Sequence, residues 1–404
     1  MAQRKGNQYH LITFYFKMMN AFRIKSWQVW KVRVPYQEGW TSTYSVFGPH
    51  GSAGDRTIIR IEDEDGFFGW GETTNNVPDE TLKAVFNKLL EPMQSAGRHS
   101  MWPAFPNPTY FHQPLPPSEF TPPEHLLKHR LRHPLNTLFE MAYCDLVARR
   151  ANVPLSTLFG GRWRDRVSVD YWMGRTTPED AAKCAKRGYA LGFRGIKLKT
   201  TLEDPNVERL EAIKDAVGED FHVTVDPNGR FYRLDDALKT ILAMDKVGNM
   251  GILEDPFARF HLQEFATLRP KIQARLVLHI DPPEMLHQVV SSGAVGGLNI
   301  DSHTQGLFAW RMQAATADQF NLPVWHGSGL DLGIYTAAQL QIASATPNCN
   351  LPGDQVGPWL RQTHLMKEDF KVEEGMVIVP DGPGLGIEVD LDALDQVTQS
   401  KFAM

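Results

Sequence analysis

Seven short apolar runs, separated by stretches with helical periodicity, occupy residues 166 to 326. The runs read VSVDYW, GIKLK, HVTVD, MGILED, RLVLHID, GLNID and LPVWH. Strands that alternate with helices predict a parallel sheet covered by helices on its outer face. Because none of the runs is suited to be an unpaired edge strand, we expect the sheet to close into an α/β barrel of the TIM type.

Six of these runs carry an ionisable residue at their C-terminal end. At intervals of 27, 28, 27, 20 and 25 residues, these ends are Lys199, Asp226, Glu254, Asp281, Asp301 and His326. Each interval is about the length of one βα unit, and barrel enzymes place their active sites at the C-terminal ends of the strands. Each acidic residue taken singly could instead cap a helix or begin a turn. Their joint recurrence predicts one shared cavity.

Three of the carboxylates come from successive strands. Asp226, Glu254 and Asp281 would repel one another strongly unless a cation compensated them. A hard divalent ion is therefore indicated. Ligation by oxygen alone favours Mg²⁺, with Mn²⁺ as a close substitute.

Two lysines share one side of the GIKLK strand. The period of two directs Lys197 and Lys199 toward the carboxylates and Leu198 toward the helices. One lysine is then placed to bind a substrate carboxylate, and the other to act as a base. We assign substrate binding to Lys197 and the role of base to Lys199, which is nearer the end of the strand.

A histidine and an aspartate end adjacent strands. His326 and Asp301 would lie within hydrogen-bonding reach and form a dyad in which the carboxylate orients the imidazole, although a structural histidine is an alternative. His279 should face the barrel interior and His303 lies just beyond Asp301. We expect both to support neighbouring groups rather than to react.

The remaining segments predict a second domain. Alternation of apolar and polar residues over 24–73, with a DEDG hairpin turn, and helical patterns at 79–94 and 134–150 indicate an α+β domain. We therefore divide the chain into an extension (1–23), an α+β capping domain (24–160), the barrel (161–370) and a segment that returns to the capping domain (371–404). A proline-rich insertion at 97–123 is a lid, an interface arm or a surface loop.

Composition excludes several classes of partner. A net charge of −5 gives no reason to expect nucleic acid or an anionic membrane, and the basic run at 125–133 is interpreted as a solvated helix face. No stretch is long and apolar enough to span a bilayer. The three cysteines, Cys144, Cys184 and Cys349, form no CxxC pair and fit a reducing cytoplasm.

The order KxK, Asp, Glu, acidic residue, Asp and His on successive strands resembles the enolase superfamily, in its mandelate racemase and muconate lactonizing enzyme family. The resemblance covers the chain from about Ile24 to its end. It implies a modified (β/α)7β barrel with an N-terminal capping domain. It also implies a Mg²⁺ ion on Asp226, Glu254 and Asp281, with Lys199 and the Asp301–His326 dyad on opposite faces of the substrate.

Departures from the family pattern refine this placement. The muconate cycloisomerase and dipeptide epimerase groups usually carry a lysine where this chain has Asp301, so the resemblance points to the mandelate racemase group. Asp281 and Asp354 stand where glutamate is common. Asp354, in PGDQVGP after the last strand, matches a residue that binds the enolate or the substrate carboxylate.

The expected reaction is abstraction of an α-proton from a carboxylate substrate. The resemblance favours dehydration of a sugar acid, an aldonate or aldarate, to a 2-keto-3-deoxy acid. A racemase or epimerase of a 2-hydroxy acid is the alternative, followed by a non-catalytic sensor of carbohydrate acids and a lysine Schiff-base aldolase. Further substrate-binding candidates are Asn228, Tyr36 and Trp40, with Thr41 and Tyr44, and a homo-oligomer is expected.

Overall fold

The computed structural model describes residues 24–37, 54–85, 87 and 134–403. The predictions that concern the extension 1–23, the insertion 97–123, the basic run 125–133, Trp40, Thr41 and Tyr44 lie outside these residues. Among the described residues, no helix combines the length and the apolar character needed to cross a membrane.

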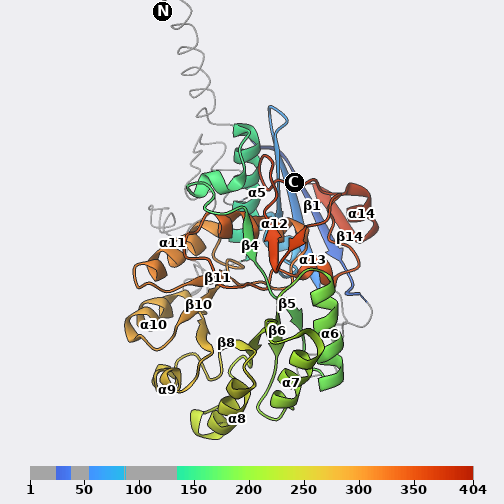
Figure 1. Cartoon of the computed structure of the whole chain (residues 1–404). Helices are drawn as coiled ribbons and strands as arrows, with labels where there is room; N and C mark the ends of the chain where they lie inside the picture. The colour runs from blue at the N-terminus through green and yellow to red at the C-terminus, as the bar shows by residue number, and fades with distance from the viewer. Residues whose placement is uncertain (1–23, 38–53, 86, 88–133, 404) are drawn as a thin grey trace, which may run out of the picture.

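An antiparallel sheet built from both ends of the described chain forms the smaller domain (Figure 1). Its order is β14–β1–β2–β3, and the bounds are Ile24–Arg33 for β1, Asp55–Asp63 for β2, Phe68–Glu72 for β3 and Thr398–Ala403 for β14. The DEDG segment joins β2 to β3 as a hairpin, in agreement with the prediction. Gly66 has a φ of 86° in this turn, a conformation that glycine adopts without strain.

Helix α5 (Pro134–Ala151) packs directly on strand β3. A Cβ atom on Gly69 would lie 1.9 Å from the carbonyl oxygen of Ala142, and one on Gly71 would lie 2.1 Å from that of Leu138. Glycine is therefore required at both positions, since any side chain would force the helix off the sheet. The helix predicted at 134–150 is present, and the one predicted at 79–94 begins as α2 (Asp79–Val85).

Seven parallel strands form the wall of the barrel, in the order β11–β10–β9–β8–β7–β6–β5. Their bounds are Tyr171–Met173 (β5), Gly195–Lys199 (β6), His222–Asp226 (β7), Met250–Glu254 (β8), Arg275–His279 (β9), Gly297–Ile300 (β10) and Val324–His326 (β11). Both faces of such strands are covered, which explains their nearly continuous apolar sequences. The predicted α/β barrel with an α+β capping domain is confirmed.

Helices cover the outside of the barrel (Figure 1). They are α6 (Pro178–Ala190), α7 (Asn206–Val217), α8 (Leu234–Val247), α9 (Leu262–Leu268), α10 (Leu286–Ser292), α11 (Leu307–Asp318) and α12 (Gly333–Ser344). Shorter elements are η4 (Leu155–Phe159), η5 (Arg269–Lys271), η6 (Pro283–Met285), α13 (Gly357–Leu360) and α14 (Leu391–Gln396).

The barrel closes through single bridges near residue 350. Val324 of β11 pairs in parallel with Cys349, and Val169 pairs in parallel with Gly353. The segment 349–353 therefore joins β11 to the chain that enters β5, without forming a regular eighth strand.

The run VSVDYW does not form one strand, so that prediction was wrong. Its first half is β4 (Arg166–Ser168), which pairs antiparallel with β13 (Met376–Ile378), and β13 pairs with β12 (Val372–Glu373). The division arises because Val169 donates its backbone N–H to Gly375 and the next N–H goes to Gly353, on the other side of the chain.

Two buried glutamates of the smaller domain accept hydrogen bonds from the first turns of barrel helices. Glu72 in β3 accepts from the N–H groups of Leu332 (2.6 Å) and Tyr335 (2.9 Å) at the start of α12. Glu140 in α5 accepts from the N–H of Phe308 (2.7 Å) in α11. Burial raises the pKa of Glu72 to about 7 and that of Glu140 to about 8. These caps hold the smaller domain against the C-terminal ends of β10 and β11.

The Glu140 cap predicts a pH-dependent stability. Because the folded-state pKa is raised, the stabilising contribution of protonated Glu140 is complete below its ordinary pKa near 4.5 and is lost as pH rises through about 8. At pH 9, Glu140→Gln should exceed the wild type in unfolding free energy by about 1–3 kcal/mol, the usual cost of an unsatisfied buried polar group. At pH 5 the two proteins should be nearly equal.

Chemical denaturation at pH 5, 7 and 9 measures this difference. Glu208→Gln, on the exposed side of α7, is the matched control and should follow the wild type throughout. Parallel curves for wild type and Glu140→Gln would show that Glu140 keeps its charge in the folded protein.

Candidate active site

The parallel register determines which side chains face the barrel interior. Lys199 is in register with Asp226, and Asn299 is in register with both His279 and Trp325. Trp325 belongs to a small apolar cluster enclosed by the strands. Since successive side chains point to opposite faces, residues in register with Trp325 face the interior and their sequence neighbours face the helices.

One lysine lies among three carboxylates in the interior. Lys197 Nζ is 2.7 Å from Glu254 Oε2, 2.9 Å from Asp354 Oδ2 and 3.3 Å from Asp226 Oδ2. Its ammonium also lies 5.5 Å from the centroid of the Trp325 ring. Burial opposes its charge, but the three carboxylates prevail and hold the pKa of Lys197 well above its usual value. Lys197 is therefore a fixed positive charge rather than a base.

The second lysine is more exposed. Lys199 forms an ion pair with Asp226 and donates a hydrogen bond to Asn228 Oδ1 (3.0 Å). Its side chain is 17% exposed, against 4% for Lys197. Asn228 has a φ of 49°, and its backbone N–H donates to Asp226 Oδ1 (2.9 Å). Asn228, predicted to bind substrate, thus orients both Lys199 and Asp226.

The donor groups fit a divalent cation. Asp226, Glu254 and Asp354 carry three negative charges, and the two lysines return two positive ones. A divalent ion together with one substrate carboxylate would bring the cluster to neutrality. Glu254 Oε2 and Asp354 Oδ1 are buried without a hydrogen bond of regular geometry, which leaves donor electrons available. Burial, reinforced by the charge of Asp226, raises the pKa of Glu254 to about 7, the response expected of a carboxylate short of cations.

The predicted third ligand, Asp281, lies apart from this cluster. Its side chain is 51% exposed and pairs with Arg259 Nη1 at 3.3 Å. Strand β9 ends at His279, and Pro282 has no N–H with which to continue the ladder. The residue at the interior end of β9 is therefore His279. Ligand atoms of His279, Glu254 and Asp255 all lie within 4.8 Å of one another.

The protonation of His279 follows from its neighbours. Arg259 Nη2 lies 3.2 Å from His279 Nδ1, and because a guanidinium only donates, Nδ1 must accept. The proton is then on Nε2, which donates to Asp301 Oδ2 at 2.9 Å. In this tautomer Asp301 orients the ring and Nδ1 is the acceptor.

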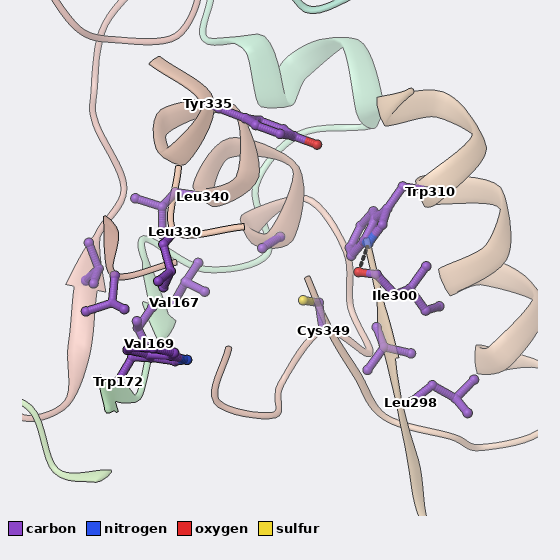
Figure 2. Packing of buried hydrophobic residues seen from close by; sticks show 14 of the residues in the cluster. Val167, Val169, Trp172, Leu298, Ile300, Trp310, Leu330, Tyr335, Leu340 and Cys349 are labelled. Carbon is purple, nitrogen blue, oxygen red and sulfur yellow. Dashed lines mark hydrogen bonds between the residues drawn. The ribbon is translucent and has the colours of Figure 1, made fainter. Parts of the chain in front are cut away.

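His326 faces the helices and not the cavity, because it is in register with Ile300, one residue beyond the interior-facing Asn299. Its ring stacks on Trp310 at 4.8 Å between centroids. Figure 2 shows Trp310 beside Ile300, to whose carbonyl the indole N–H donates. His326 Nδ1 bonds to the Gly327 carbonyl (2.7 Å), and burial lowers the pKa of His326 to about 4.

The predicted hydrogen bond between Asp301 and His326 was wrong. His326 Nε2 accepts instead from Ser302 Oγ at 2.9 Å, and Ser302 accepts from the Tyr335 hydroxyl at 2.7 Å. With the His326 proton on Nδ1, that nitrogen donates to the Gly327 carbonyl, and Nε2 and the Ser302 hydroxyl each have a partner as well. The physical reason is the alternation of faces, which sends Asp301 inward and His326 outward.

His303 occupies the position that the sequence gave to His326. Its Nδ1 lies 3.3 Å from Asp301 Oδ1 and its Nε2 lies 3.4 Å from Asp331 Oδ2. Burial alone would lower the pKa of His303, but the two carboxylates raise it to about 10, so the ring is an imidazolium. The His303 side chain is 18% exposed, whereas His326 is completely buried.

Tyr36 lies at the border between the two domains. Its hydroxyl accepts a hydrogen bond from Arg361 Nη2 at 3.2 Å, and the guanidinium lies 4.4 Å from the centroid of its ring. Arg361 also donates to the carbonyl of Val34. These contacts tie the polar ring of Tyr36 to a structural arginine, and its role in substrate binding stays a prediction.

Comparisons with known proteins identify the family. The family described as Enolase C-terminal domain-like matches residues 179–393. A chloromuconate cycloisomerase of Cupriavidus pinatubonensis is 30% identical over 262 residues, which cover 62% of this chain and 68% of the relative. The chain belongs to the mandelate racemase and muconate lactonizing enzyme family of the enolase superfamily. It is an enzyme of α-proton abstraction, a chemistry for which the superfamily uses a divalent metal ion.

Relatives within this family carry different names. An o-succinylbenzoate synthase of Geobacillus kaustophilus is 29% identical over 355 residues, covering 85% of this chain and 88% of the relative. A D-gluconate dehydratase of Thermoproteus tenax is 26% identical over 275 residues, covering 64% and 54%. The crystal structure of N-succinyl Arg/Lys racemase from Bacillus cereus has a TM-score of 0.73 at 20% identity, with 95% of this chain and 100% of that chain covered.

The contact of Lys197 with three carboxylates predicts that the stability of a Lys197→Met protein depends on a divalent ion. Lys197→Met leaves Asp226, Glu254 and Asp354 without their central ammonium and should cost about 3–5 kcal/mol of unfolding free energy in EDTA. Millimolar MnCl2 or MgCl2 should recover part of that loss, because the ion supplies the missing positive charge.

Urea unfolding with and without the ion measures both effects. Lys183→Met is the control, because Lys183 pairs with Asp180 on the surface of α6 and should change stability by less than about 1 kcal/mol. A Lys197→Met protein as stable as the wild type in EDTA would show that the three carboxylates are not charged together.

Proposed function

We propose that the protein dehydrates a hydroxylated carboxylate, an aldonate or aldarate, to a 2-keto-3-deoxy acid. The observation that carries this proposal is the presence of a potential base and a potential acid on separate walls. Lys199 ends β6, and His303 follows β10, with β7, β8 and β9 between them in the sheet. A substrate above the strand ends would lie between the two groups.

Proton removal is assigned to Lys199. A divalent cation on Asp226 would take over the charge that Lys199 balances, so that the Lys199 side chain could give up its extra proton to solvent. Its neutral amine then takes the substrate α-proton, and Lys197 remains charged beside Asp226 and Glu254. Asp226 and Glu254 would hold the divalent cation, which would stabilise the negative charge that develops on the substrate carboxylate. Asn228, hydrogen-bonded to Lys199, directs the amine. Lys197 provides the positive charge for the substrate carboxylate, and Asp354, 2.9 Å from Lys197, holds that ammonium in place.

Loss of hydroxide is assigned to His303. The bond between the β-carbon and its oxygen breaks while the imidazolium gives that oxygen a proton, so the leaving group departs as water. The resulting enol takes a proton at the β-carbon and loses the proton of its hydroxyl, which gives the 2-keto acid. A ring held between Asp301 and Asp331 is protonated at neutral pH and therefore suits an acid better than a base.

Racemisation is the second candidate. A racemase would need His303 to remove the α-proton of one enantiomer as readily as it protonates the other. Asp301 and Asp331 stabilise the protonated ring and so make His303 a poor base. In its support, the fold is shared with a protein titled N-succinyl Arg/Lys racemase. Dehydration is supported by a relative named D-gluconate dehydratase. The narrower placement in the mandelate racemase group rests on Asp301 in place of lysine.

Exchange of the α-proton tests the base. A library of mono- and diacid sugars is incubated with the protein and a divalent ion in deuterium oxide, and NMR follows deuterium at the α-carbon while semicarbazide detects keto product. Lys199→Met should lower exchange by at least about 10³-fold, since the group that takes the proton is gone. Unchanged exchange in this variant would refute Lys199 as the base.

A comparison of two histidine variants tests the acid. His303→Asn should keep α-proton exchange within about tenfold and lose keto product by about 10²–10⁴-fold, the usual contribution of a general acid. His326→Asn should retain the wild-type ratio of product to exchange, because its ring faces α11. The reverse pattern would restore His326 as the acid, and formation of an epimer by wild type would favour the racemase.

A further inference from the structure

His279 stands where strand geometry requires an interior ligand. It ends β9 and is in register with Asn299, whose amide donates to Glu254 Oε1 at 2.6 Å. The same edge of the barrel carries Asp226 and Glu254 at the ends of β7 and β8. Three successive strands thus end in two carboxylates and one imidazole.

The tautomer of His279 suits a metal ligand. Asp301 accepts the Nε2 proton at 2.9 Å, which leaves the lone pair of Nδ1 directed away from Asp301. A carboxylate behind a neutral histidine fixes the ring and raises the basicity of its free nitrogen. This is the arrangement in which proteins present histidine to a metal.

Two carboxylate oxygens lie close to the His279 ring. A carboxylate oxygen of Glu254 and one of Asp255 are within 4.8 Å of the His279 ligand atom. Glu254 is completely buried, and its Oε2 receives no hydrogen bond of regular geometry, although Lys197 Nζ lies 2.7 Å away. A buried carboxylate oxygen beside an imidazole whose Nδ1 contacts only Arg259 among the printed hydrogen bonds of the described residues provides two donors around which a cation can bind.

We infer that the ion of this enzyme is bound through Nδ1 of His279 as well as through carboxylate oxygens, and that this mixed site prefers Mn²⁺ to Mg²⁺. The inference rests on the proposed function only for the presence of an ion. Imidazole suits transition metals, whereas Mg²⁺ favours oxygen ligands, so one nitrogen shifts the preference toward Mn²⁺. Asp281 is then a partner of Arg259 and not a ligand.

Arg259 competes with the ion and remains held when the ion binds. Its Nη2 contacts His279 Nδ1, but its Nε donates to Asp255 at 2.7 Å and its Nη1 lies 3.3 Å from Asp281. Binding of a cation therefore displaces one contact of the guanidinium and leaves two. The neighbouring positive charge weakens the binding of Mn²⁺ and Mg²⁺ alike.

Electron spin-echo spectroscopy of the full-length protein with one equivalent of Mn²⁺ tests the ligand directly, since a coordinated imidazole gives ¹⁴N couplings. Wild type should show the couplings, and His279→Asp should lose them while still binding Mn²⁺. Titration calorimetry with MnCl2 and MgCl2 should find that the Mn²⁺-to-Mg²⁺ ratio of affinities falls by about tenfold or more in His279→Asp. Asp301→Asn should weaken Mn²⁺ binding by about 10–100-fold.

His261→Asn, a surface change on the connection between β8 and α9, is the control and should preserve both the couplings and the affinity ratio. Bound Mn²⁺ without ¹⁴N couplings, or couplings that persist in His279→Asp, would overturn the inference. Neither result would affect the proposed dehydration, which is measured separately by keto product. Couplings in a protein that forms no keto product from any acid would sustain the ligand and refute the reaction.

Discussion

The interaction on which the site depends is the buried contact of one ammonium with three carboxylates. Lys197 compensates Asp226, Glu254 and Asp354 within a barrel that otherwise encloses Trp325 and other apolar residues. Hydrophobic residues in these places would generally give a more stable protein than a buried ion cluster. An ion cluster buried despite its cost in folding free energy indicates a role in binding or chemistry. Its net charge also determines which charged ligands can bind beside it.

The smaller domain takes part in this electrostatic arrangement. Its Glu72 and Glu140 cap helices that begin beside the C-terminal ends of β11 and β10, and its Thr74 hydroxyl donates to Asp331 at 2.9 Å. Asp331 in turn faces His303. The position of the His303 imidazolium therefore depends on how the two domains are docked. Among the described residues, Glu72 and Glu140 have no lysine or arginine at hydrogen-bonding distance, and their partners are backbone N–H groups of the barrel helices.

The sequence was sufficient for the fold class, and it placed several ionisable residues at strand ends, whereas their roles in the site stay predictions. Strands β6, β7 and β8 end at the ionisable residue itself, so the ends of the apolar runs correctly located Lys199, Asp226 and Glu254. In β9 and β11 the ionisable residue at the end of the run was misleading. The ladder of β9 stops at His279 before the proline pair, and His326 ends β11 but falls on the outer face. A shift of one residue moves a side chain to the other face, and a residue beyond the last ladder pair is no longer held on either face, so the register and the strand end decide both cases.

Two departures from the family pattern explain each other. A chain with a carboxylate at the end of β9 would leave Asp301 with no ring to orient, and a chain with the lysine common in muconate cycloisomerases at position 301 would place a positive charge against the Nε2 proton of His279. Asp301 instead accepts that proton and also binds His303. One carboxylate thereby orients both rings, while Arg259 on one ring and Asp331 on the other give the two imidazoles different surroundings.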